Sequence, residues 1–177
     1  MRRIRAGLIA LFAAAAPAAP AAARAAVIAA PQLTLWEAVV ALAVRVPFAR
    51  AHVERVLGAT LRATGRGGNE LFYLYESTPV PLAGGVVIAN VDLRIAREGS
   101  HPGFMVLDIG GSCVSLADVR RQYGTLRLTG YPRGRSFHET TSHTSQRSWG
   151  TLSFGFAERN PDCLSSIAFD PAKAPPP

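Results

Sequence analysis

The segment VVIANVDLRI, residues 86–95, gives the first indication of the fold class of this chain. Apolar and charged residues alternate in its second half: Val91, Leu93 and Ile95 against Asp92 and Arg94. A period of two predicts a β-strand with one buried and one solvated face. One face of such a sheet must be covered, and apolar helices elsewhere in the chain can cover it.

Two further strand candidates flank this segment, LFYLYE at 71–76 and FMVLDI at 104–109. The segments between them, PVPLAGG and REGSHPG, are rich in turn residues. Short connections favour antiparallel pairing of neighbouring strands. Later in the chain, segments 126–129, 149–156 and 164–169 predict additional strands.

Three segments predict helices: 34–46, 48–57 and 115–123. Thr34 and Glu37 have the spacing of a capping box, and Ser115 with Asp118 forms a shorter analogue. Gly58 is placed to end the second helix in the left-handed conformation. The first helix is apolar around most of its surface, which favours a packed helix over a membrane anchor because it is short.

These elements predict an α+β domain over residues 34–170, a helical hairpin packed on an antiparallel sheet. Residues 52–58 and 118–124 align without gaps and share valine, arginine and glycine at equivalent positions. The repeat suggests two tandem α-then-β-meander units, 48–110 and 113–170. The alternative is two unrelated helices that both stop at glycine, which is common.

The N-terminal residues 1–25 have the layout of a secretory signal peptide, with three early arginines, an apolar run and Ala-Arg-Ala at the end. An alanine-rich tail is the alternative. Residues 26–33 are expected to be a linker and 171–177 a disordered tail. Removing the leader leaves 15 basic and 12 acidic residues, so the formal charge of +7 falls to about +3. The balance no longer indicates nucleic acid, and the expected location is periplasmic or secreted, with no integral membrane segment after cleavage.

The chain has two cysteines, Cys113 and Cys163, and both follow the predicted leader. Export favours a disulfide between them, with two buried free thiols as the alternative. They lack the CxxC spacing and adjacent histidine that would indicate a catalytic cysteine.

The helix ending V-x-x-V-L-G at 53–58, followed by an aromatic strand with Phe72, Tyr73 and Tyr75, resembles a known superfamily. The chain resembles the β-lactamase-inhibitor-protein and SmpA/OmlA type of module over about residues 34–170. The resemblance implies an exported, often non-enzymatic α+β module that binds another protein. It carries over no functional residue, and the lipoprotein cysteine of the outer-membrane branch is missing after the apolar run.

The polar stretch YPRGRSFHETTSHTSQR, residues 131–147, is the most unusual part of the sequence. His138 and His143 are five residues apart, so the pattern is HExxxH rather than the HExxH of zinc peptidases. Neither a helix nor a strand puts that spacing on one face, so no metal and no cofactor is expected. The stretch is interpreted as a solvated hairpin or loop, or as a partner-binding loop with Arg133, Arg135 and both histidines.

Tyr73 and Tyr75 share one strand face, and Phe72 and Leu74 share the other. If the sheet has a solvent side, one set is exposed. Tyr73 and Tyr75 are therefore candidates for a protein-binding surface, with core packing as the alternative. The hypothesis is an exported inhibitor, immunity-type or envelope-associated domain that binds protein without catalysis. The alternative is a small secreted hydrolase that uses His138, Glu139 and His143.

Overall fold

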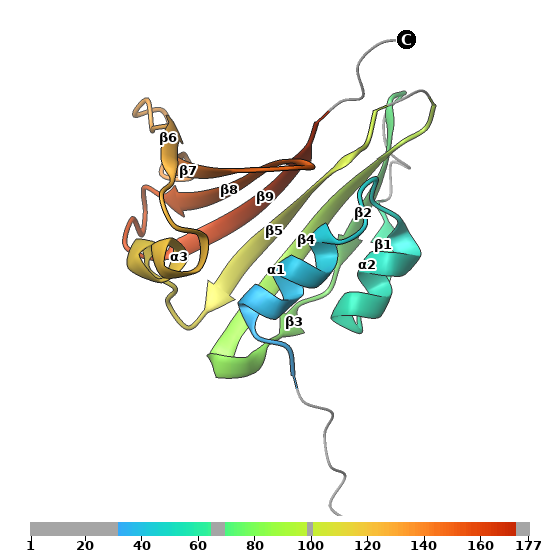
Figure 1. Ribbon diagram of the computed structural model, residues 1–177, viewed down its shortest axis with the longest axis horizontal. Helices are drawn as coiled ribbons and strands as arrows, with labels where there is room; N and C mark the ends of the chain where they lie inside the picture. The colour runs from blue at the N-terminus through green and yellow to red at the C-terminus, as the bar shows by residue number, and fades with distance from the viewer. Residues whose placement is uncertain (1–31, 65–69, 99–100, 173–177) are drawn as a thin grey trace, which may run out of the picture. The chain divides into compact units, whose positions relative to one another are not determined.

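One large antiparallel sheet dominates the fold (Figure 1). The computed structural model describes residues 32–64, 70–98 and 101–172. The predicted leader, most of the linker and residues 173–177 of the predicted tail lie outside these ranges. Within them, three α-helices and nine strands give a mixed α+β fold, which confirms the predicted class. No described helix is long and apolar enough to cross a membrane.

The helices are α1 (Leu35–Ala43), α2 (Arg50–Leu57) and α3 (Leu116–Tyr123), with a short 3-10 turn at Ala83–Gly85. The strands are β1 (Leu61–Ala63), β2 (Phe72–Ser77), β3 (Val80–Pro81), β4 (Val86–Ala96), β5 (Phe104–Gly111), β6 (Arg127–Gly130), β7 (Thr140–Arg147), β8 (Gly150–Ala157) and β9 (Leu164–Pro171). Their order across the sheet is β1-β2-β4-β5-β9-β8-β7-β6. The short strand β3 pairs with the first residues of β4.

The alternation in β4 has the predicted effect on burial. Val91 and Leu93 are fully buried, whereas Asp92 and Arg94 form an ion pair of 2.6 Å on the other side of the strand. The register continues this division through the sheet, because Leu93 lies opposite Met105 and Met105 lies opposite Phe169. One face of the sheet is therefore apolar from β4 to β9 and forms the floor of the core.

The capping boxes predicted for α1 and α3 are both present. In α3, the Ser115 backbone N–H and hydroxyl donate to the Asp118 carboxylate at 2.7 Å, and the Asp118 backbone N–H donates to the Ser115 oxygen. These bonds hold the pKa of Asp118 below its ordinary value. The first helix ends at Ala43 rather than at Val46, with Val44 as its C-cap. Pro47 disfavours the α region at Val46, so the helix cannot easily reach that residue.

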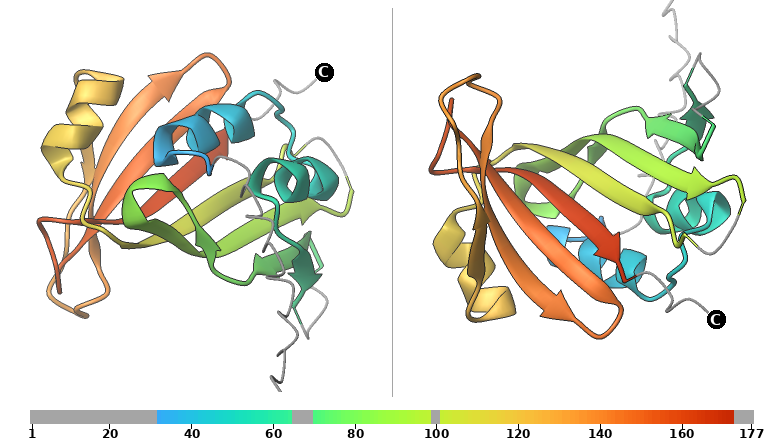
Figure 2. Two further views of the ribbon diagram at one scale, coloured as in Figure 1. Left: turned by 90° about the horizontal axis from the view of Figure 1, so that it is seen from below. Right: turned by 90° about the horizontal axis from the view of Figure 1, so that it is seen from above.

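The three helices cover the apolar face of the sheet. Figure 2 shows α1 and α2 in front of the strands from one side and behind them from the opposite side. Aromatic side chains connect the helical layer to the sheet. The ring centroids of Tyr123 and Phe154 are 4.9 Å apart, and those of Phe48 and Phe169 are 6.0 Å apart. The opposite side of the sheet is here called the helix-free face.

The polar stretch 131–147 is not one loop. Its second half is β7, which pairs with β6 on one side and β8 on the other. On the helix-free face, the hydroxyls of Thr129, Thr144 and Ser153 form a hydrogen-bonded chain with distances of 2.7 and 2.8 Å. Serine and threonine satisfy one another there, which explains how a polar segment forms an interior strand.

The C-terminal strand extends slightly past the expected domain end at residue 170. Pro171 belongs to β9, and the Ala172 backbone N–H donates to the Trp149 carbonyl oxygen at 2.9 Å. The backbone bond ties the end of β9 to the turn that precedes β8.

Candidate functional site

Two loops lie side by side at one end of the sheet. They are the β6–β7 loop, residues 131–139, and the β8–β9 loop, residues 158–163. The backbone N–H of Glu158 donates to the Glu139 carbonyl at 2.9 Å, and that of Arg159 donates to the Phe137 carbonyl at 3.2 Å. The pair of loops is called the loop end below.

The β6–β7 loop also has hydrogen bonds of its own. The backbone N–H of Arg133 donates to the Glu139 carboxylate, which closes the loop at its base. The backbone N–H of His138 donates to the Ser136 hydroxyl at 3.1 Å, and that of Glu139 donates to the Ser136 carbonyl at 3.1 Å. These bonds give a polar loop a defined backbone conformation.

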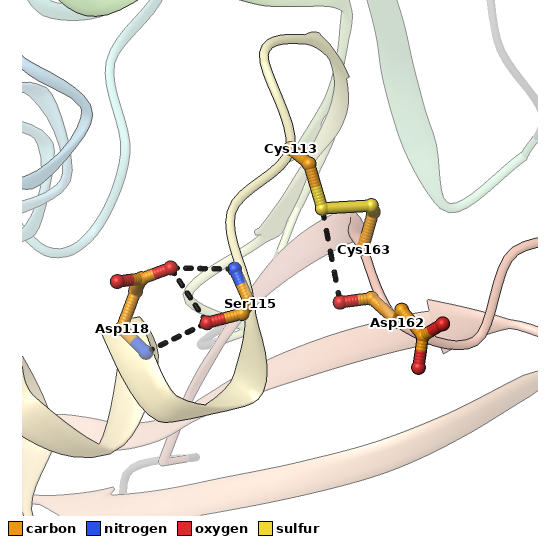
Figure 3. Close-up of a disulfide and its surroundings, with 5 residues drawn as sticks. All are labelled: Cys113, Ser115, Asp118, Asp162 and Cys163. Atoms are coloured by element: carbon orange, nitrogen blue, oxygen red, sulfur yellow. Dashed lines mark hydrogen bonds between the residues drawn. A yellow bond between two sulfur atoms is a disulfide. The ribbon is translucent and has the colours of Figure 1, made fainter.

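A disulfide anchors the second loop, which confirms the predicted Cys113–Cys163 pair (Figure 3). Their Cα atoms are 5.1 Å apart, within the usual range for such a bridge. The Cys113 sulfur lies 3.8 Å from the Asp162 carbonyl oxygen, a contact rather than a hydrogen bond because a disulfide sulfur carries no hydrogen. Two residues beyond Cys113, Ser115 caps α3, so the bridge ties the β8–β9 loop to the start of a helix.

The loop end exposes aromatic and cationic side chains together. Tyr131 is 73% exposed and Phe137 is 76% exposed, and Arg133, Arg135 and His138 are also exposed. In the part of the chain that the structure describes, no carboxylate side chain forms an ion pair with either arginine. Exposed aromatic rings beside free guanidinium groups are the chemistry of protein-binding hot spots.

Tyr73 and Tyr75 lie on the helix-covered side of the sheet, because they pair with Ile95 and Leu93. Tyr75 packs against the core with the Arg50 guanidinium 5.3 Å from its ring centroid. Tyr73 is 42% exposed and has the Arg97 guanidinium 4.1 Å from its ring. The strand order places both tyrosines far from the loop end, and their binding role stays a prediction.

The structure does not bring His138 and His143 together. His138 is exposed on the β6–β7 loop, whereas His143 is a β7 residue opposite Phe154 on the helix-covered side. The His143 ring lies 5.8 Å from the Phe156 ring, edge to face. Across the described ranges, no group of three His, Cys, Asp or Glu side chains is arranged to hold a metal ion.

His143 is expected to make the stability of the domain depend on pH. Burial lowers the pKa of His143, and the Arg120 guanidinium on α3 lowers it further. The unfolded chain then binds more protons than the native one below about pH 6.5, so stability falls as the pH falls through this range. We expect the urea midpoint to drop between about pH 7.5 and about pH 5.5, and His143→Gln to remove most of the drop.

The matched control is His138→Gln, on the exposed loop, which should keep the pH dependence of the wild type. The lowered carboxyl pKa values of Glu37, Glu54 and Asp118 act only at lower pH. An unchanged pH dependence in His143→Gln would refute the assignment to His143.

No protein-family model, curated protein or solved structure matches this chain. The site therefore rests on its own geometry. Sequence reasoning selected Arg133, Arg135 and His138 but did not select Tyr131 and Phe137, the two large apolar side chains that the loop exposes most. Their position in a stretch otherwise free of large apolar residues was the available signal.

Proposed function

We propose that this chain is an exported protein-binding domain without catalysis, of the inhibitor, immunity or envelope-associated kind. In this proposal its partner docks on the loop end. The observation that carries the proposal is the exposure of Tyr131 and Phe137, each about three-quarters exposed, on a hydrogen-bonded loop. A rigid loop loses little conformational entropy when a partner binds, which favours affinity.

The cross-linked architecture supports the same proposal. The disulfide holds the β8–β9 loop, and that loop bonds to the backbone of the β6–β7 loop at Phe137 and Glu139. A disulfide is also typical of proteins that leave the reducing cytosol, which supports export. Arg133 and Arg135 form no ion pair with any carboxylate that the structure describes, which supports a partner surface that carries carboxylates.

We further propose that the domain consists of two tandem α-then-β-meander units, as in the β-lactamase-inhibitor and SmpA/OmlA modules. The strand order supports this, because β1-β2-β4-β5 and β6-β7-β8-β9 are equivalent meanders that meet at their last strands, β5 and β9. A short helix precedes each meander, and a glycine, Gly58 or Gly124, follows each helix.

The loop end can be tested by removing its two aromatic side chains. The wild type should capture a stoichiometric partner from an envelope extract, and the double variant Tyr131→Ser with Phe137→Ser should not. The affinity of the double variant for that partner should be lower by about tenfold or more. Its thermal unfolding should stay close to the wild type because both side chains are exposed. Affinity is measured with the captured partner by surface plasmon resonance.

The matched control is Leu71→Ser, which changes a side chain of similar exposure, 68%, before β2. It should bind like the wild type. Failure of the wild type to recover any stoichiometric partner, or equal recovery by the double variant, would contradict the proposal.

A further inference from the structure

Two clefts lie between α1 and α3 on the helix-covered side of the molecule, and together they are called the furrow. A cleft of about 430 Å³ at one end is lined by the start of α1 and by Asp118, Arg121 and Gln122 of α3. A second cleft of about 250 Å³ lies at the other end. Trp36 and Tyr123 meet between the two clefts with their ring centroids 5.7 Å apart.

The second cleft is lined mainly by apolar side chains. It is lined by one stripe of α1 and its C-cap, by the end of α3, and by residues of the β7–β8 hairpin: Val39, Val40, Ala43, Val44, Tyr123, Arg147, Trp149 and Leu152. Val40 and Val44 stand on its rim and are 54% and 73% exposed. They are four residues apart, Val40 on α1 and Val44 at its C-cap with helical backbone angles, and so form one ridge inclined by roughly 26° to the helix axis.

Arg147 supplies the charge of this cleft. Its guanidinium lies 5.4 Å from the Tyr123 ring centroid and contacts the Ser145 hydroxyl at 3.5 Å. Within the ranges that the structure describes, Arg147 forms no ion pair with a carboxylate. The cleft therefore combines an apolar floor with one uncompensated positive charge, and a carboxylate beside apolar groups is its complement.

We propose that this furrow binds an amphipathic helix of an acidic partner. The partner helix places its apolar ridge between Val44 and Trp149 of this chain and one of its carboxylates beside Arg147. A small molecule inside the cleft would leave the rim valines exposed, whereas a helix would cover them. Helices pack by placing ridges in grooves, and the Val40–Val44 ridge beside the cleft offers that geometry. The second cleft, which carries the proposal, shares no residue with the loop end and does not depend on the function proposed there.

The probe is a fluorescein-labelled helical peptide with leucine at i, i+3, i+4 and i+7 and glutamate on its other faces. A counterpart with lysine in place of glutamate is the charge control. Fluorescence anisotropy should show saturable binding of the glutamate peptide only. Arg147→Gln should weaken that binding about tenfold, and Val40→Ser with Val44→Ser should weaken it by a similar factor.

Two substitutions elsewhere provide matched controls, Arg127→Gln for the charge and Leu128→Ser for an apolar side chain that is 55% exposed. Both should bind the glutamate peptide like the wild type. The proposal is overturned if the wild type does not bind the glutamate peptide, if the lysine peptide binds equally, or if the controls weaken binding as much. Dimerisation of the chain that Val44→Ser abolishes would assign the furrow to a second copy instead.

Discussion

Replacing both Cys113 and Cys163 by serine is expected to lower the free energy of unfolding by about 4 kcal/mol. The two cysteines are 50 residues apart in sequence, and the bridge removes the freedom of that long loop from the unfolded chain. The loss is measured by urea denaturation of the double variant and of the wild type. Reduction of the wild type should produce the same shift.

The loop end should respond to the same change. Because the β8–β9 loop holds the β6–β7 loop through its backbone, the amides of Glu158 and Arg159 should exchange with solvent faster in the variant. A variant whose urea midpoint matches that of the oxidised wild type would show that the bridge does not stabilise the fold. Unchanged exchange at these amides would show that the bridge does not order the loop end.

Phe154→Ala is expected to destabilise the domain by about 4 kcal/mol. Phe154 is fully buried at the centre of β8, between Ile167 of β9 and His143 of β7, and Tyr123 packs on its ring. Truncation leaves a cavity between the sheet and α3 that rigid neighbours fill only in part. Thermal and urea unfolding followed by circular dichroism measure the loss.

Phe137→Ala is the matched control, because it removes the same side chain from the exposed tip of the loop end. Its stability should stay within about 0.5 kcal/mol of the wild type. Equal losses in the two variants would mean that Phe137 is packed in solution. A small loss in Phe154→Ala would mean that the sheet and α3 close over the cavity.

Most features that sequence analysis predicted well depend on neighbours along the chain. A capping box needs only two residues three positions apart, so the sequence was enough to predict Thr34 with Glu37 and Ser115 with Asp118. The alternating burial in β4 could be predicted because successive side chains of any strand point to opposite faces of the sheet. The disulfide was readable because the chain has only one pair of cysteines to join.

The interior strand β7 could not be predicted from a local pattern. Its sequence TTSHTSQR has no large apolar residue, so no hydrophobic period marks it as a strand. It becomes one because β6 and β8 satisfy its backbone on both sides and because Thr144 bonds to hydroxyls on both neighbours. The cross-strand contacts come from segments that a local pattern does not include.

Local patterns and composition were enough to predict the α+β class, the helix caps, the alternation of the β4 strand and the cysteine pair, because each depends on local geometry or on residue counts. Tertiary structure alone decided the strand order, the meeting of β5 and β9, the side on which Tyr73 and Tyr75 lie, and the exposure of Tyr131 and Phe137. Each of these depends on which distant segments pack together. The packing of distant segments minimises the free energy of the whole core, so it cannot be predicted from any short stretch of the chain.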